Sequence, residues 1–252
     1  MSIWRFANPT NFMRLSGALM PVMAVGGAAA LFVGVVWGLF FTPPDYQQGD
    51  TVRIMYIHVP AAMMAINIYF IMALASAIGI IRRHHVSFLV AKAAAPIGAG
   101  LTLAAILTGA LWGQPTWGTW WEWDPKLTSI LIMLFFYLGY IGLWAAIDDP
   151  DKASDLTGVL CLVGVVFAVF ARYAVEIFGD QTLHQGASLS LDAESNVDPV
   201  FYRPLIVTVA GFYMFFIALL LQRARTEIRL RRTRALRLAA AAEGAAPAGE
   251  PA

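Results

Sequence analysis

Residues 18–41 read ALMPVMAVGGAAALFVGVVWGLFF, a stretch without a single charged side chain. A helix needs about 20 mostly apolar residues to cross the roughly 30 Å hydrocarbon core of a bilayer, and this stretch meets that length. It is longer than the apolar core of a signal peptide, and it follows a segment that contains Arg5 and Arg14. We therefore predict that it is retained as a membrane span.

Five further runs lack Asp, Glu, Lys and Arg: residues 54–81, 93–121, 127–147, 156–171 and 204–222. The chain as a whole has 252 residues, of which 59% are apolar and 13% are charged. Soluble domains contain about 25% charged residues, so the composition argues against an ordinary cytosolic enzyme. We predict an all-α membrane protein, a bundle of six transmembrane helices at about 18–41, 58–81, 93–112, 127–147, 156–179 and 205–222.

The basic residues between the spans indicate how the chain is oriented. One side of the membrane receives Arg5, Arg14, Arg82, Arg83, Lys92, Lys152 and the arginines of residues 223–237. The other side receives only Arg53, Lys126, Arg172 and Arg203. Because cytoplasmic loops carry an excess of Lys and Arg, the first side is predicted to be cytoplasmic, with both termini. Residues 42–57, 113–126 and 180–204 then face outward.

Composition excludes several classes of function. The formal net charge is only +1 with dispersed basic residues, so nothing favours a nucleic-acid partner. Cys161 is the only cysteine, which excludes a disulfide framework and covalent attachment of a c-type haem within this chain. The sequence contains no glycine-rich phosphate loop, so any ATP hydrolysis is expected to belong to a partner subunit.

The C-terminal end differs from the rest of the chain. We divide the sequence into a six-helix transmembrane domain, residues 1–222, and a cytoplasmic tail, residues 223–252. The arginine-rich residues 223–237 are predicted to extend the last helix and to contact anionic lipid. The Ala-, Pro- and Gly-rich residues 239–252 are predicted to be disordered.

The outer segment between the third and fourth spans contains five of the eight tryptophans: Trp112, Trp117, Trp120, Trp121 and Trp123. Tryptophans at membrane boundaries commonly form an interfacial belt, and that interpretation stays open. A belt is spread over many helix ends, however, whereas these residues share one short segment. A helix would put Trp117, Trp120, Trp121 and Asp124 on one face, and an extended chain would align Trp117, Trp121 and Trp123. Either arrangement favours a large planar ligand.

The other two outer segments each contain one histidine. His58 lies at the mouth of the second span, and His184 lies in the segment before the sixth. Each histidine alone is typical of a hydrogen-bonded interfacial residue. Together they favour a functional site, because ionisable residues at membrane depth are costly. Two neutral imidazoles can approach one metal from opposite sides, and beside a planar aromatic surface the best-matched ligand is haem.

Haem also carries two propionates, which need cations or water-accessible hydrogen-bond donors near the membrane interface. Arg53 and Lys126 are the better candidates on the outer side, because Arg53 lies close to His58 in sequence and Lys126 close to Asp124. Arg172 is instead expected to pair with Glu176 on its own helix, at i,i+4 spacing.

Particular strings resemble a known family. Trp-Gly-Thr-Trp-Trp-Glu-Trp-Asp at 117–124 resembles the tryptophan-rich WWD signature of membrane haem-handling proteins. Together with six spans, the strings Arg-Ile-Met-Tyr-Ile-His-Val-Pro at 53–60 and Thr-Leu-His-Gln at 182–185 resemble the CcmC family, haem exporter protein C of the cytochrome c maturation system. The resemblance covers residues from about 15 to 222.

The resemblance implies a multi-pass protein of the bacterial inner membrane that presents haem b, bound without a covalent bond, on the periplasmic side. It implies His58 and His184 as axial metal ligands. The implied partners are the ATPase and permease subunits of an ABC transporter, a small single-span membrane subunit and a periplasmic haem chaperone. The candidate haem-binding residues are His58, His184, Trp112, Trp117, Trp120, Trp121, Trp123, Asp124, Arg53 and Lys126.

Two other classes of function stay open at this point. A haem-conducting channel subunit would need a polar or aromatic path across the bilayer, yet the spans offer few polar groups beyond Asn67, Thr102, Thr108 and Thr157. A membrane haem-dependent redox enzyme or lyase would need an electron or proton route, yet the spans contain no second pair of haem ligands and no carboxylate relay. The sequence therefore favours haem binding and delivery over catalysis.

Overall fold

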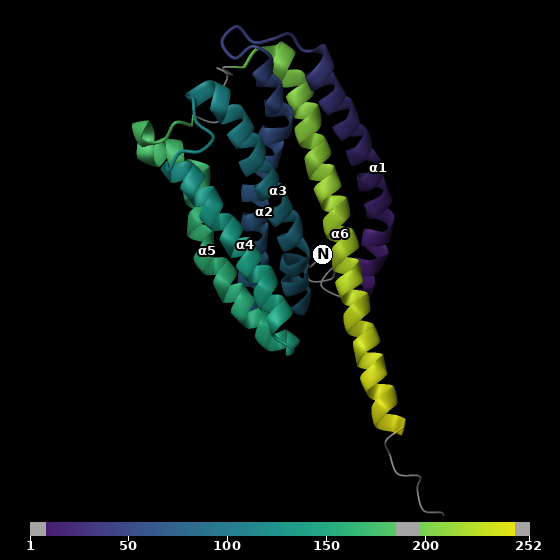
Figure 1. Ribbon diagram of the computed structural model, residues 1–252. Helices are drawn as coiled ribbons and strands as arrows, with labels where there is room; N and C mark the ends of the chain where they lie inside the picture. Colours follow the sequence, from purple (N-terminus) through teal and green to yellow (C-terminus); the bar gives the residue numbers. More distant parts are fainter. Residues whose placement is uncertain (1–8, 185–196, 245–252) are drawn as a thin grey trace, which may run out of the picture.

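The computed structural model describes residues 9–184 and 197–244, which form six long helices (Figure 1). These are α1 (Pro9–Phe41), α2 (Met55–Arg82), α3 (His85–Trp117), α4 (Pro125–Ala146), α5 (Pro150–Phe178) and α6 (Pro199–Gly244), with short 3-10 helices η2 (Asp50–Ile54) and η3 (Gly179–Gln181). All six are long and apolar enough to cross a membrane. Within the described ranges the only strand-like pairing is an isolated bridge between Asp45 and Gly49. The predicted all-α bundle of six transmembrane helices is confirmed.

Several helices extend beyond the predicted spans. α3 begins at His85 and includes Lys92, whose ammonium group lies 2.7 Å from the Glu227 carboxylate of α6. At its other end α3 continues through Trp117 and stops where Gly118 adopts a φ of 79°, a left-handed conformation that glycine tolerates. Part of the predicted outer loop, residues 113–117, is therefore helical. The tryptophan-rich loop itself is limited to residues 118–124.

α6 is longer than its charge-free run by many turns and projects beyond the bundle (Figure 1). The arginine-rich residues 223–237 continue the helix, as predicted. The helix also continues past Leu238 to Gly244, where the sequence predicted disorder. Residues 239–242 are all alanine, the strongest helix former, which accounts for the difference. The rest of the predicted disordered tail, residues 245–252, lies outside the described residues.

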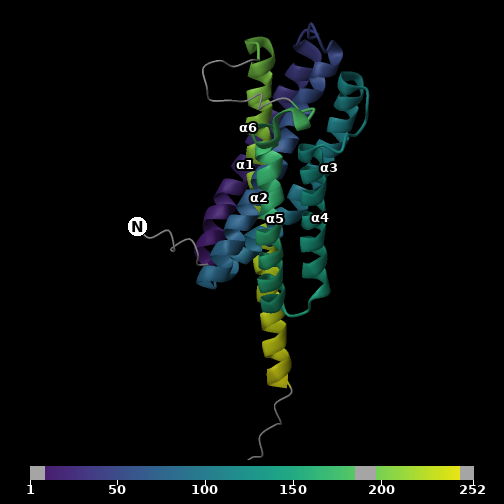
Figure 2. The ribbon, with the colours of Figure 1, turned by 90° about the vertical axis from the view of Figure 1, so that its left-hand side faces the viewer.

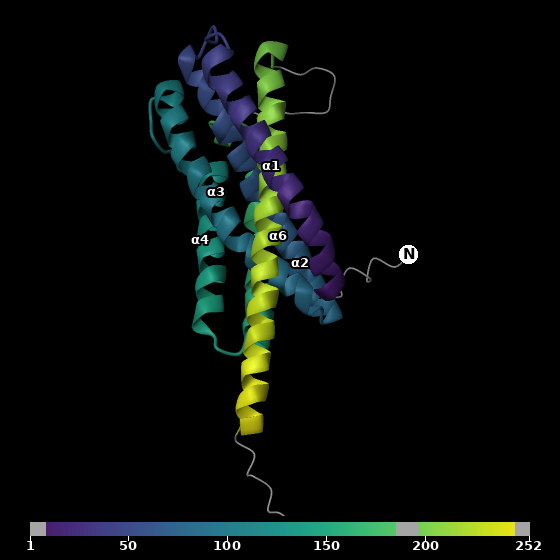
Figure 3. The ribbon, with the colours of Figure 1, turned by 90° about the vertical axis from the view of Figure 1, so that its right-hand side faces the viewer.

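The helices form two groups in space. α2, α3, α4 and α5 pack against one another, and Figure 2 shows α3 and α4 side by side next to α5. α6 contacts this group on one side and α1 on the other, and α1 lies mainly along α6 (Figure 3). The outermost helix is therefore anchored chiefly through a single neighbour.

The core of the larger group is built from aromatic and sulfur-containing side chains packed on small ones. The Tyr69 and Tyr137 rings meet edge to face with centroids 4.9 Å apart, and both side chains are fully buried. The Tyr137 hydroxyl donates to the Ala65 carbonyl at 2.8 Å, so its buried polar group is satisfied. Gly98 lies directly against the Tyr137 ring, where a side chain would collide.

The α1–α6 contact depends on glycines that let the two backbones approach closely. A Cβ atom on Gly27 would lie 2.6 Å from the Phe215 backbone nitrogen, and one on Gly211 would lie 2.6 Å from the Leu31 backbone nitrogen. Gly34 faces Thr208 in the same way, with its backbone nitrogen 2.7 Å away. Small residues serve this purpose in membrane helices because close packing replaces the hydrophobic effect as the driving force.

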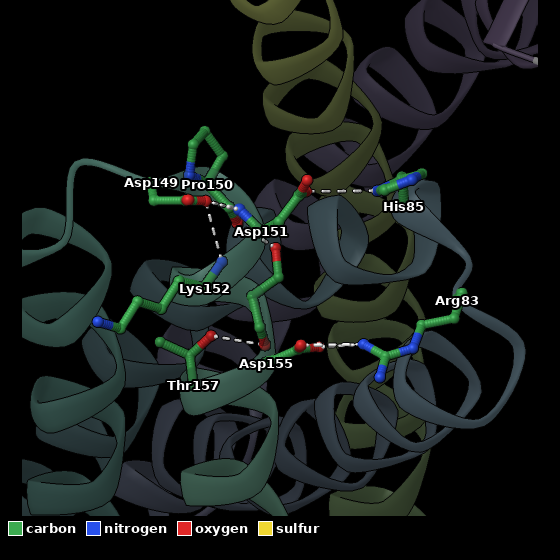
Figure 4. A network of polar contacts seen from close by, with 9 residues as sticks. Arg83, His85, Asp149, Pro150, Asp151, Lys152, Asp155 and Thr157 are labelled. Atoms are coloured by element: carbon green, nitrogen blue, oxygen red, sulfur yellow. Dashed lines mark hydrogen bonds and ion pairs between the residues drawn. The ribbon is translucent and has the colours of Figure 1, made fainter.

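A polar network joins helices at one end of the bundle (Figure 4). Arg83, after α2, pairs with Asp155 of α5 at 2.9 Å, and His85 pairs with Asp151 at 3.7 Å. Asp149 caps α5 by accepting hydrogen bonds from the amides of Lys152 and Asp151, and these bonds hold the pKa of its carboxyl below the ordinary value. Every one of these residues lies on the side that the charge pattern assigns to the cytoplasm.

The opposite end of the bundle carries the unusual residues. The segment between α1 and α2, the tryptophan-rich loop and the start of α6 all lie there (Figure 1). Residues 179–184 follow α5 at that same end. The alternation of helices thus brings together the parts of the sequence that contain His58, the tryptophans and His184.

Candidate functional site

A cavity of about 460 Å³ opens between α2, α3, α4 and α5 at this end. Its volume lies within the range of about 300–1,000 Å³ that is typical of small-molecule sites. The wall is mostly apolar and includes Met63, Ile66, Ile106 and Ile130. Such a cavity suits a largely hydrophobic ligand.

The cavity reaches into the bundle instead of lying flat on its surface. Along α2 its lining runs from His58 to Asn67, which are about two and a half turns or 13 Å apart at 1.5 Å per residue. The Asn67 amide at the deep end donates to the Tyr213 hydroxyl of α6. Beyond Asn67, the Tyr69 and Met72 side chains are fully buried in the core.

His58 and His184 both line the cavity and face each other. Their ring centroids are 6.4 Å apart and their planes are inclined by 27°. A bond between a metal ion and an imidazole nitrogen is about 2 Å long, so two imidazoles on opposite sides of one ion have centroids roughly 6 Å apart. The observed centroid distance is therefore compatible with two imidazoles on either side of one ion.

Two neighbours on α3 orient the His58 ring. The Thr108 hydroxyl lies 3.1 Å from His58 Nδ1 and donates its own proton to the Ala104 carbonyl at 2.7 Å. In the tautomer that matches this direction, Nδ1 donates to Thr108 and the lone pair of Nε2 is available to a ligand in the cavity. The ring also lies over Gly109, where a Cβ atom would approach His58 Cε1 to 2.9 Å.

Three of the five clustered tryptophans line the cavity: Trp112, Trp117 and Trp121. Trp112 meets the His58 ring edge to face at 5.6 Å, and its indole N–H donates to the Gln48 side chain at 2.8 Å. Trp117 meets the His184 ring at 6.0 Å. Each histidine thus packs beside one indole ring of α3.

The other two tryptophans are placed differently. Trp120 is 59% exposed and Trp123 is 73% exposed, and the cavity lining includes neither. Of the five candidate haem-binding tryptophans, the structure therefore brings only Trp112, Trp117 and Trp121 to the cavity. The helix ends at Trp117, so neither the fully helical nor the fully extended alignment applies to the whole segment.

Asp124 is only 4% exposed and does not line the cavity. One carboxylate oxygen accepts a hydrogen bond from the Leu127 amide and so caps α4. The other oxygen accepts from the Thr182 hydroxyl at 2.7 Å and from the Leu183 amide at 3.1 Å. Its contacts are with the chain next to His184 and not with the space available to a ligand.

Some of the basic residues at this end line the cavity and others do not. Lys126 lines the cavity, and Arg172 and Glu176 line it beside Lys126. Arg172 and Glu176 form the predicted ion pair, at 3.7 Å. Arg53 lies outside the lining, since its guanidinium donates to the Thr42 carbonyl at 3.0 Å and pairs with Asp50 at 3.2 Å. Of the two predicted propionate partners, only Lys126 lines the cavity.

The site also contains residues that the sequence did not point to. Thr108 and Gly109 set the position of His58, and Gln48 holds Trp112. Thr182 was visible only as part of a motif string. No local pattern marks the first three, because their partners lie far away in sequence.

Fold and site together define a class: a polytopic helical membrane protein with a cavity walled by tryptophans and flanked by two facing imidazoles. The profile of the family described as heme exporter protein C matches residues 2–239. The chain is 61% identical to heme exporter protein C of Paracoccus denitrificans and 60% identical to that of Rhodobacter capsulatus, each over 94% of this chain and 97% of the relative. It is 42% identical to that of Escherichia coli (strain K12), over 91% of each chain. The protein therefore belongs to the heme exporter protein C family.

Proposed function

We propose that this protein binds haem b without a covalent bond in the cavity, with His58 and His184 as axial ligands. The observation that carries the proposal is the pair of imidazole rings, 6.4 Å apart across a cavity walled by Trp112, Trp117 and Trp121. Indole rings pack well on a flat macrocycle through dispersion and apolar burial. The family's description as a heme exporter supports haem as the ligand.

The protein is proposed to hand this haem to a periplasmic chaperone during maturation of c-type cytochromes, at the outer face of the bacterial inner membrane. Trp120 and Trp123 support this step, because their exposed rings lie in the loop directly after the cavity wall. The ABC transporter subunits and a small single-span subunit complete the proposed assembly, and a partner subunit hydrolyses ATP. This chain binds and transfers haem and is not an enzyme in the proposal.

Delivery from one side agrees better with the cavity than conduction across the membrane does. The lining on α2 stops at Asn67, and the tightly packed Tyr69, Met72 and Tyr137 follow. The cavity residues of this end of the bundle would therefore hold the haem, and they leave no continuous path along α2 to the other end.

Haem binding tests the proposal directly. Titration of haem into the detergent-purified protein is expected to give a low-spin spectrum typical of two imidazole ligands. His58→Ala and His184→Ala are each expected to lose stable haem, as quantified by the pyridine haemochrome, because one axial ligand and its packing are removed. A His58→Ala protein that keeps full, unshifted haem absorbance would falsify the assignment.

The propionates provide a second test within the same site. Lys126→Gln is expected to weaken haem affinity by roughly tenfold, since it removes a cation from the cavity wall near the mouth. Arg53→Gln is the matched control, and it should change affinity little because Arg53 is bound to Thr42 and Asp50. The reverse order of effects, measured by haem titration at low and high salt, would place the propionates on the Arg53 side.

A further inference from the structure

A chain of hydrogen bonds joins the start of α4 to the segment that carries His184. Asp124 accepts from the Thr182 hydroxyl at 2.7 Å, and the same hydroxyl oxygen accepts from the His184 amide at 3.2 Å. The Asp124 carboxylate also accepts from the Leu183 amide at 3.1 Å. Three consecutive residues are thereby fixed relative to one carboxylate.

The segment that carries His184 is not held by a helix. η3 ends at Gln181, and residues 182–184 have no regular secondary structure. His184 nevertheless faces His58 across the cavity, and its ring packs on Trp117. A loop residue keeps such a position only where its backbone is anchored, and the carboxylate of Asp124 is an anchor fixed at a helix end.

We propose that Asp124 is a positioning residue for His184. It acts through Thr182 and the Leu183 amide, and it does not touch the bound ligand. This assignment rests on the proposed function for the role of His184 as a metal ligand. It gives the aspartate of the WWD string and the threonine of the Thr-Leu-His string one shared task, although they are far apart in sequence.

The chemistry of Asp124 predicts how substitutions behave. Asparagine can still cap α4 through its carbonyl oxygen, but its NH₂ group would then face the Leu183 N–H, and two donors cannot bond to each other. Asp124→Asn should therefore leave α4 intact and loosen the segment at Leu183, whose amide loses its acceptor. Thr182→Val removes only the hydroxyl between Asp124 and the His184 amide and leaves the cap of α4 untouched.

Haem titration of the full-length protein is the first measurement. Asp124→Asn and Thr182→Val are expected to lose the low-spin spectrum and to bind haem about 10- to 100-fold more weakly, the usual loss when a group that orients a metal ligand is removed. Added imidazole should restore the low-spin spectrum, since it can occupy the position that His184 leaves. Because imidazole also makes free haem low-spin, the spectrum is taken on haem that stays with the protein through gel filtration, and a variant that has failed to fold would retain none.

Hydrogen exchange without haem is the second measurement. The peptide that contains Leu183 and His184 is expected to exchange about tenfold faster in both variants, because two of its amides lose their acceptors or their alignment. Asp149→Asn is the matched control: Asp149 also caps a helix and precedes a proline, but it lies at the opposite end of the bundle. Its spectrum and its exchange in this peptide should equal those of the wild type.

The outcomes separate the two proposals. Unchanged exchange and an unchanged spectrum in Asp124→Asn and Thr182→Val would overturn the positioning role. Faster exchange in both variants, combined with an unchanged haem spectrum in His184→Ala, would instead overturn His184 as a ligand and with it the proposed haem site.

Discussion

Valine at position 109 is expected to remove stable haem binding as completely as the loss of His58 itself. A Cβ atom there would already lie 2.9 Å from His58 Cε1, and the two methyl groups of valine add further overlap. Trp112 and Thr108, on the same helix, also contact the ring, so a side chain at position 109 is expected to displace it from this set of contacts. Pyridine haemochrome quantification measures the haem that remains in the purified variant, which is expected to fall to the level of His58→Ala.

Gly100→Val is the control for this prediction. Gly100 lies on the same helix, and a Cβ atom there meets nothing within 4 Å. Both variants carry the same small helix-propensity change, so a difference between them reports only the contact with His58. Equal haem content in Gly109→Val and Gly100→Val would show that the ring is not confined as the structure indicates.

The spans were predictable because lipid leaves few alternatives to long apolar helices, and the charge-free runs marked each one. The helix ends were less predictable, as Lys92 illustrates. It bounded a predicted span, yet it lies within α3, where Glu227 pairs with it and its ammonium group lies 4.7 Å from the centre of the Trp144 ring. Local sequence cannot reveal partners on other helices that make a charge acceptable.

In the site, likewise, the types of residue involved could be predicted from the sequence, but the contacts that each one makes could not. His58, His184 and the tryptophans could be selected from the sequence, because their side chains suit a metal and a flat ligand and the topology gathers them at one end. The sequence could not show that Asp124 and Arg53 contact other parts of the chain instead of lining the cavity. Asp124 looked like a ligand contact because of its neighbours, while its actual partner Thr182 lies on a different outer segment.

The second large effect concerns stability and leaves the site untouched. Gly27→Val combined with Gly34→Val is expected to separate α1 from α6, because a side chain at either position would collide with the backbone of α6. Overpacking costs about 1–3 kcal/mol per site, or roughly 2–6 kcal/mol for the pair. For a chain of this size that corresponds to a loss of about 5–20 °C in the unfolding temperature.

The measurement is thermal unfolding of the detergent-purified protein, beside a Gly100→Val and Gly142→Val double variant in which both positions face open space. No α1 residue lines the cavity, so the Gly27 and Gly34 variant should keep the wild-type haem spectrum below its lowered unfolding temperature. An unfolding temperature equal to that of the control would mean that α1 does not depend on close contact with α6. Loss of haem at low temperature would instead show that α1 supports the histidines, which the position of α1 on the far side of α6 argues against.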